Sequence, residues 1–362
     1  MTATAAAAGL TVQQWDDQFF VDSINANYFS SYMGQSENSL IQVKENLMKS
    51  KGDSDTFGLV NKLSGSATTG SSTLEGNEEQ LISRSQKLTI DQYRHAVLIP
   101  VLEEQFSAID LRKAGRSALM TWETELVRDQ IIDSLGSING VVYGTASEGE
   151  KDAWITDNND RVLFGATTSN YSSGDMSASL LNIDNTADKL TPDLISLMKR
   201  LAKNASPKVG PLKGRTKTSR SDAYVLFVGS LALRDLEQNS DFILDQRNAR
   251  GRGKDNPIFS GADYVVKNCA IVEVEDIPVT GGVGAAGIQV APVYLCGVQA
   301  LGMLIAKRPE SVSEEFDYGD KQGLAIRQMH KIGKLTFGTG SSDVADLKDH
   351  GMVTAFVAAL SD

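Results

Sequence analysis

The stretch that decides the fold is residues 56–136, which opens with TFGLVNKL (56–63) and SGSATTGSSTLEG (64–76). LISRSQKLTIDQYRHAVLI (81–99) follows, and polar residues occupy both faces of any strand that it forms. Two polar arms around a tip rich in Ser, Thr and Gly predict a long β-ribbon. Such a ribbon buries little apolar surface and is marginally stable alone. We therefore expect it to lie on something outside its own chain, most simply a second copy.

A long helix is predicted directly after this ribbon, over about residues 109–135. The stretch contains no proline, and apolar residues recur in it at helical spacing: Leu119, Trp122, Leu126, Val127, Ile131 and Leu135. Ser107 or Asp110 could cap its start, and Gly136 follows the last periodic residue. At ~1.5 Å per residue the helix would be ~40 Å long, which is enough to form the backbone of a wedge-shaped subunit.

The order of a projecting ribbon, a long helix and a mixed α/β body resembles the major capsid protein of tailed double-stranded DNA phages. The chain is most similar to the short-tailed-phage branch, and the same fold is used by encapsulins and by the herpesvirus shell floor. The segments that carry the resemblance are IDLRKAGRSALMTWETELVRDQIIDSL (109–135), NPIFSG (256–261) before CAIVEVEDIP (269–278), LCGVQAL (295–301), EEFDYG (314–319) and IRQMHKIGKLTF (326–337).

This resemblance implies an α+β fold of the tailed-phage major capsid type. The divisions that it implies are an N-terminal arm (1–56), an extended β-ribbon or E-loop (57–100), a peripheral domain with the spine helix (101–139), a mainly axial domain with an insertion (140–310), a return to the peripheral domain (311–345) and a C-terminal strand of the axial domain (346–362).

The resemblance also implies the function. The chain would self-assemble as hexamers and pentamers into the icosahedral shell that encloses the phage genome. Scaffolding, portal and decoration proteins would be its further partners, and it would enclose double-stranded DNA without sequence-specific binding. Its place would be the virion capsid, after synthesis in the host cytoplasm, with no contact with a membrane.

Composition agrees with a container wall. A chain of 362 residues with 41% hydrophobic content can bury a sizeable core. The net charge of −11 argues against a classical nucleic-acid binder, whose affinity comes from Lys and Arg. Cys269 and Cys296 are too few for a disulfide scaffold and are expected to be inert core thiols.

Neither the first ten residues nor the most apolar stretch predicts a membrane segment. MTATAAAAGL (1–10) lacks the basic region of a signal peptide. Residues 293–306 are shorter than the ~20 residues that span a bilayer, and they are expected to form a core helix or a strand followed by a helix.

The remaining pattern predicts a mixed body. Residues 140–189 are dominated by Gly, Asn, Asp and Ser and are expected to be rich in loops. Thr191 and Pro192 begin a predicted helix that runs to Ala205. Further predicted elements are strands at 223–228, 269–277, 324–332 with the following KLTF, and 351–360, and a helix from Ser230.

Gly282, Gly284 and Gly287 form a literal G-x-G-x-x-G, the pattern of a dinucleotide-binding loop. Such a site needs its third glycine in the first turn of a helix, whereas an extended stretch ending at Pro292 follows here. The flanks therefore favour a hairpin with a glycine loop. Two alternatives to a phage capsid remain: a cellular protein cage of the same fold, and a nicotinamide-dependent oxidoreductase that uses this loop.

No catalytic, cofactor-binding or metal-binding residue is predicted, because the three histidines are scattered and residues 157–160 lack the spacing of a calcium loop. Residues 194–221 carry eight Lys and Arg and no acid, in a chain of net negative charge. They would meet the acidic ribbon tip of a neighbour or face packaged DNA, and charge complementarity favours the neighbour. The candidate interface residues are Phe57, Leu59, Glu75, Glu78, Glu79, Lys87, Tyr93, Lys213, Arg215 and Lys217.

Overall fold

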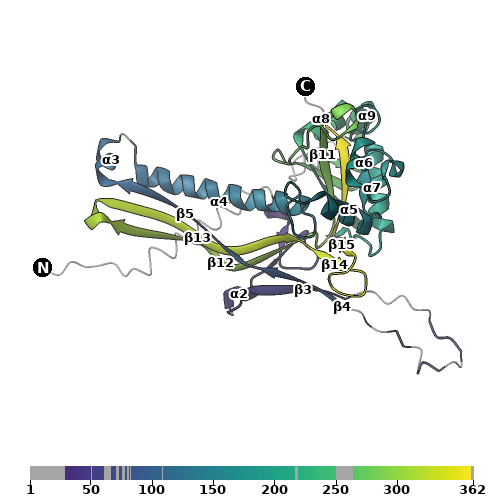
Figure 1. The fold of residues 1–362 in the computed structure, drawn as a ribbon, viewed down its shortest axis with the longest axis horizontal. Helices are drawn as coiled ribbons and strands as arrows, with labels where there is room; N and C mark the ends of the chain where they lie inside the picture. Colours follow the sequence, from purple (N-terminus) through teal and green to yellow (C-terminus); the bar gives the residue numbers. More distant parts are fainter. Residues whose placement is uncertain are drawn as a thin grey trace.

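The computed structural model describes residues 29–359, except for 50, 61–66, 71, 72, 76, 77, 80, 82, 108, 217, 218 and 250–263. The molecule is elongated (Figure 1). A body of strands and helices lies at one end, and a long helix and three long strands extend from it to the far end. A separate β-ribbon lies on the opposite side of these strands from the long helix.

A seven-stranded mixed sheet organises the body. Its strands, in spatial order, are β6 (Val162–Phe164), β16 (Met352–Ala358), β11 (Val290–Cys296), β8 (Ser219–Val228), β10 (Cys269–Glu273) and β9 (Tyr264–Val266), with β7 (Leu212–Thr216) paired to β8. Every residue of the central strands β11 and β16 is buried. A sheet that is covered on both faces shows such continuous apolar strands.

Different helices cover the two faces of this sheet. Val293 and Leu295 of β11 pack in one cluster with α7 (Pro192–Asn204) and α8 (Ser230–Gln238). On the other face, Tyr294 contacts the end of α4 (Leu111–Gly136). This second face is also covered by α5 (Glu148–Asp157) and α6 (Met176–Leu181). On the first face, α9 (Ser240–Ala249) packs on α8. The end of the long helix is therefore part of the body's core.

A five-stranded sheet forms the extension, in the order β1 (Met33–Gly34), β2 (Ile41–Lys44), β12 (Leu301–Phe316), β13 (Lys321–Lys334) and β5 (Asp91–Pro100). Strand β12 begins buried in the body and ends exposed. Helix α4 packs along β13 and β5, where Leu119 meets Ile326. The far end is closed by α3 (Val101–Phe106) and by the β12–β13 turn.

The predicted long helix is confirmed as α4. Asp110 is its N-cap: the backbone N–H of Lys113 donates to the Asp110 carboxylate at 3.0 Å. The alternative cap, Ser107, instead ends α3. A capping carboxylate at the helix start also suits the positive end of the helix dipole.

The ribbon differs from its prediction in two ways. Strand β3 (Ser54–Val60) pairs with β4 (Ser83–Thr89) as a two-stranded ribbon. The predicted second arm divides at Ile90, and its second half, β5, pairs with β13 in the five-stranded sheet. The expectation that the ribbon has cover only outside its own chain is wrong at its base. Phe57, only 2% exposed, packs with Leu88 on a small cluster of the same chain. Gly302 permits this approach, since a Cβ there would lie 2.9 Å from the Phe57 ring.

One further expectation is wrong. Residues 293–306 contain no helix but two strands, β11 and β12, joined by a turn in which Gln299 has a φ of 53°. Most of residues 140–189 lie outside helices and strands, as predicted, and the segment also holds α5, β6 and α6. Helix α5 starts at a capping box in which Ser147 and Glu150 each bond the other's backbone N–H.

The other predicted elements are confirmed as α7, β8, α8, β10, β13 and β16. The predicted KLTF strand corresponds to β14 (Thr336–Gly338), which pairs with β15 (Leu347–Asp349). The short elements are η1 (Ser30–Tyr32), α2 (Asn46–Lys49), η2 (Thr168–Asn170), η4 (Ala285–Gly287) and η5 (Asp317–Gly319). Among the described residues, no helix is both long enough and apolar enough to cross a membrane.

Candidate assembly surfaces

The ribbon is tied to its own chain along β4. The Ser85 hydroxyl donates to Asp343 at 2.7 Å, and Arg84 donates to the carbonyl of Gly340. The Gln86 amide donates to the carbonyl of Lys334 at 2.9 Å and accepts from the N–H of Thr336 at 2.8 Å. These bonds and the Phe57 cluster fix the position of β3 and β4, the base of the ribbon.

The candidate interface residues of the ribbon therefore fall into two groups. Phe57 is buried in its own chain, and Leu59 is half-buried against the same cluster, so Phe57 is not available to a neighbour. Lys87 is exposed, as are the three acidic residues near the tip, Glu75, Glu78 and Glu79. Val60, at the end of β3, is also exposed.

Tyr93 lies within the extension and not on the ribbon. It is on β5, half-buried, with its ring 4.7 Å from that of His330. Burial raises the pKa of Tyr93, with smaller contributions from neighbouring charges. Part of the side chain is thus already occupied by intramolecular packing.

The basic segment runs through α7, β7 and the start of β8. Lys213 is exposed, and its backbone N–H and carbonyl both bond the side chain of Asn38, at 3.0 and 3.1 Å. Arg215 belongs to β7 but its side chain is not among those described, and Lys217 lies outside the described residues. Among the described residues, no ion pair joins Lys213 to the acidic tip of the same chain.

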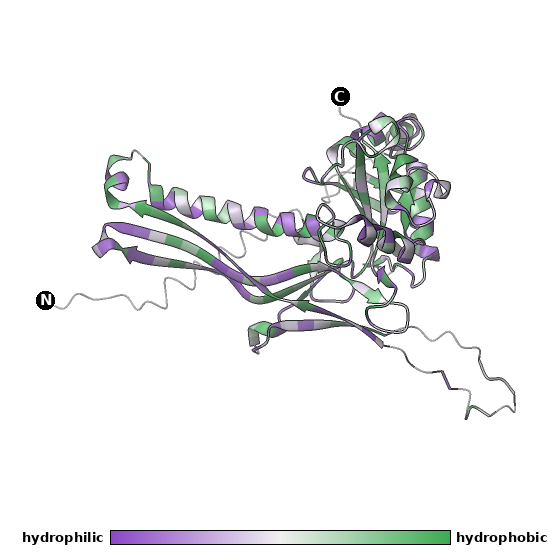
Figure 2. Ribbon diagram, in the orientation of Figure 1, coloured by the Kyte–Doolittle hydropathy of each residue, from purple (hydrophilic) through white to green (hydrophobic). Residues whose placement is uncertain are grey.

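An apolar patch that the sequence analysis did not single out lies at the far end of the extension. Here we call it the distal patch; its large exposed members are Leu98, Val101, Leu102, Phe106, Ile109, Phe316 and Tyr318. They come from α3, the connection between α3 and α4, the adjoining ends of β5 and β12, and the β12–β13 turn (Figure 1). Figure 2 shows apolar stretches on α3 and on the end of β5. A patch of this kind marks an interaction surface.

The turn that carries Tyr318 is strained. Asp317 and Tyr318 both have a φ of 55°, and Tyr318 is fully exposed. A left-handed conformation is costly for a bulky side chain and is tolerated where surrounding structure or function requires it. The sequence feature that could have indicated this turn is DYG (317–319), which lies between the two long strands β12 and β13.

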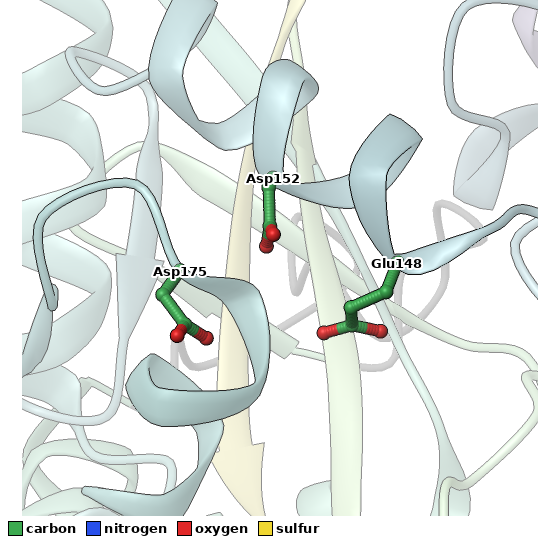
Figure 3. A group of neighbouring side chains, drawn as sticks. All are labelled: Glu148, Asp152 and Asp175. Atoms are coloured by element: carbon green, nitrogen blue, oxygen red, sulfur yellow. The ribbon is translucent and has the colours of Figure 1, made fainter.

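Glu148, Asp152 and Asp175 bring three carboxylates together between α5 and α6 (Figure 3). Each already has a protein partner. Asp152 accepts from the N–H of Met176 at 2.7 Å, Asp175 accepts from the N–H of Ala178 at 2.8 Å, and Glu148 accepts from the Ser177 hydroxyl. Capping of α6 and its attachment to α5 account for the group.

The glycine loop has the predicted hairpin geometry. Thr280 and Val290 form a β-bridge around it, and Gly287 ends the short η4. The strand β11 begins at Val290, so no helix follows the third glycine. The N-terminal turn that would receive a pyrophosphate is therefore not formed at this loop.

Burial favours the neutral forms of two histidines and of both cysteines. Burial lowers the pKa of His330 and of His350 to about 4. Burial raises the pKa of the thiols of Cys269 and Cys296, so both remain protonated and unreactive, as predicted for inert core cysteines.

The chain combines an anchored ribbon, a long spine helix along an extended sheet and an α/β body, and this architecture is similar to that of solved phage capsids. The chain belongs to the family described as "Phage capsid protein", which it matches over residues 3–360. It is therefore a structural protein of the phage virion with the α+β capsid fold.

Two kinds of relative agree with this assignment. The chain is 27% identical to the major capsid protein of Pseudomonas phage KPP25, over 97% of each chain. It is similar to the capsid of cyanophage Pam1, with a TM-score of 0.82 and 27% identity over 100% of both chains. The capsid of Ralstonia phage GP4 has the same fold, with a TM-score of 0.74 and 22% identity over 100% of this chain and 96% of that one.

Proposed function

We propose that this chain is the major capsid protein of its phage and assembles as hexamers and pentamers into an icosahedral shell. The observation that carries the proposal is the near-complete match to the phage capsid family in a chain whose ribbon is fixed at its base on its own chain. A ribbon whose base is already fixed loses less conformational entropy when it covers a neighbour.

In this proposal each part of the subunit has a mechanical role. The ribbon forms the E-loop, which begins at β3 and ends with β4. Of the expected arm (1–56), residues 1–28 lie outside the described residues, and residues 33–44 contribute β1 and β2 to the five-stranded sheet. Strand β5, α3, α4 and the β12–β13 pair form the peripheral domain, and the body sheet with its helices forms the axial domain. The chain acts as a wall and not as an enzyme. Scaffolding, portal and decoration proteins are its further partners, and double-stranded DNA is enclosed without sequence-specific contacts.

Contacts between copies are proposed to include an electrostatic component. Lys87, Leu59 and Tyr93 line one side of the contact with a neighbour. The acidic residues Glu75, Glu78 and Glu79 meet the basic residues Lys213, Arg215 and Lys217 of another copy. Opposite charges on two fixed protein surfaces pair geometrically and set the register of an interface.

A charge-reversal experiment tests this contact. Changing Lys213, Arg215 and Lys217 together to Glu should reduce the yield of empty shells at least tenfold, and adding the reversal of Glu75, Glu78 and Glu79 to Lys should restore it. Lys113→Glu, an exposed position on α4, is the control and should assemble normally. Shell yield is measured by electron microscopy and gradient sedimentation.

Measurement of packaged DNA on the same variants separates the two roles of the basic segment. Normal shells with reduced packaging would mean that the segment faces DNA, where neutralisation is diffuse and follows salt. Normal shells with normal packaging would contradict both roles. Failure of the wild-type chain to form shells with its scaffolding protein would contradict the proposed function itself.

A further inference from the structure

The two faces of the body sheet carry outer layers of opposite charge. Helix α7 covers one face, and the end of α4 together with α5 covers the other. Packed layers lie ~10 Å apart, so these two outer surfaces are separated by about twice that distance, which exceeds the Debye length of ~8 Å in physiological salt. Each surface therefore presents its own net charge to whatever lies beside the body.

The surface of α7 is basic. Here we call it the basic face; its exposed charged members are Arg200, Lys203, Lys208 and Lys267. The ammonium of Lys199 donates to the carbonyl of Lys267, which joins α7 to the β9–β10 turn. Among the described residues, no ion pair engages Arg200, Lys203 or Lys208. Lys267 pairs with Asp193 at 3.6 Å, but the Asp193 side chain is 98% exposed, and an ion pair so open to water neutralises little charge.

The surface of the α4 end and α5 is acidic. Here we call it the acidic face; its exposed carboxylates belong to Asp129, Asp133, Glu148, Glu150 and Asp276. Asp133 of α4 and Lys151 of α5 line the same cavity, so the two helices form one continuous surface. The pKa of Asp133 is raised by burial and by the Asp129 carboxylate. The raised pKa indicates that negative charge is concentrated at this point.

The two bases on the acidic face do not cancel its charge. Arg128 is shared between Asp129, at 3.0 Å, and Asp276, at 3.1 Å. Lys151 lies 3.9 Å from Glu148. Both bases are therefore engaged with carboxylates of their own chain, and the acidic face keeps a negative net charge.

Opposite charges on opposite faces determine which contacts between copies are favourable. A two-fold contact joins the same surface of two copies, which here would place the basic face on the basic face, or the acidic face on the acidic face. A head-to-tail contact instead joins the basic face of one copy to the acidic face of the next, and such contacts close into rings. Charge complementarity therefore favours a ring of bodies over a two-fold dimer.

We propose that the basic face of each copy packs against the acidic face of the neighbouring copy around every ring of subunits. The inference rests on the proposed self-assembly, and it names the contact that orders the bodies within one pentamer or hexamer. It is separate from the contact of the ribbon tip, because Lys213 lies on β7, where its backbone bonds Asn38, and not on α7.

A charge swap in the full chain tests this contact. Arg200→Glu with Lys203→Glu should reduce the yield of shells formed with the scaffolding protein at least tenfold, because like charges would then face each other. Asp129→Lys with Glu148→Lys should reduce it by the same factor. The four changes together restore opposite charges with the faces exchanged, and the yield should return to within threefold of wild type.

Lys51→Glu with Lys113→Glu is the matched control. Both positions are exposed and lie outside the two faces, and the pair changes the net charge as much as the reversal on α7 does. This variant should assemble normally. Thermal melting shows whether each variant folds. Where a reversed pair does not fold, the neutral pairs replace it: Arg200→Gln with Lys203→Gln, and Asp129→Asn with Glu148→Gln, each with an expected loss of at least threefold.

Several outcomes would overturn the inference while wild-type shells form normally. They are a normal yield from either folded pair, a fourfold variant that is no better than the pairs, and a control that is impaired as strongly. Normal shells with reduced DNA packaging in the α7 variant also overturn it, because the basic face would then contact DNA. Failure of the wild-type chain to form shells is a different result, since it contradicts the proposed function itself.

Discussion

His330 and His350 lie in two different parts of the molecule; His330 is buried, with 2% of its surface exposed, and His350 is partly buried. His330 shares a 2.6 Å hydrogen bond with the Gln130 side chain and lies against the Tyr93 ring. His350 meets the edge of the Phe337 ring, and its Nδ1 has no partner among the described residues. Neither position offers a carboxylate in direct contact that would stabilise an imidazolium, so burial decides their protonation.

These two histidines predict a loss of stability in mild acid. Their folded pKa of about 4 lies below the ordinary value of 6.5, so the unfolded chain binds protons that the native chain does not. Their contribution to stability is complete above pH 6.5 and falls as the pH decreases toward 4. The expected loss is about 1 to 3 kcal/mol per histidine. Chemical denaturation at pH 7.0, 5.5 and 4.5 measures it.

Substitution separates this effect from that of the carboxylates. His330→Gln and His350→Gln should each flatten the decline between pH 6.5 and 4.5, whatever their cost at pH 7. His95→Gln, at an exposed position, should leave the slope unchanged. An identical slope in wild type and both core variants would show that other groups cause the acid sensitivity.

At the scale of single elements, the helices with clear ends were predictable. Thr191 and Pro192 predicted the start of α7, and the Thr191 hydroxyl indeed accepts from the N–H of Leu194. Asp110 likewise marks the start of α4. In these cases the signal is local, because the cap and the first turn are a few residues apart.

Elements defined by distant partners were not predictable. The sequence 81–99 has no break at Ile90, yet β4 and β5 belong to different sheets because β13 pairs with β5 and the Phe57 cluster receives β4. The capping box at Ser147 was a usable local signal for α5 that the abundance of polar residues obscured. A pocket lined by the end of α4, by α5 and by the body sheet left no signal in the sequence, since its walls meet only through tertiary packing.

Trp122 tests how deeply the spine helix is embedded. A fully buried position would predict a cost of about 3 to 5 kcal/mol for Trp122→Ala. In the structure Trp122 is half-buried, and its ring stacks on that of His95 at 4.9 Å. We therefore expect a cost of about 2 kcal/mol in the free energy of unfolding, from roughly half of the ring's buried area.

Two variants on the same helix bracket this value. Leu119→Ala, at a buried position, should cost about 2 to 5 kcal/mol. Thr121→Ala, at an exposed one, should stay within about 0.5 kcal/mol of wild type. Denaturant titration measures all three. A Trp122→Ala cost above about 4 kcal/mol, or a cost equal to that of Thr121→Ala, would contradict the half-buried stack.

The whole molecule exposes apolar surface at the end of its extension. Its two sheets share the end of α4 and the start of β12 near the body, and the extension then continues with one helix on one face of a narrow sheet. The distal patch lies where this cover ends, with Phe106 75% exposed. Apolar surface of this kind favours association by removal from water, and it lies far from the ribbon that projects from the other side.

We therefore expect the isolated chain to sediment as pentamers, hexamers or shells across a wide concentration range, and the distal patch to contribute to this association. Phe106→Asp combined with Tyr318→Asp should shift the distribution to smaller species without changing the melting temperature by more than about 2 °C, since both side chains are exposed. Leu181→Asp, an exposed apolar position on α6 of the body, is the matched control.

Sedimentation velocity with and without the scaffolding protein measures the outcome. If the wild-type chain remains a monomer under both conditions, self-association is contradicted; if the double variant assembles as well as wild type, the patch is not a contact between copies, and the strained turn at Tyr318 must serve another partner.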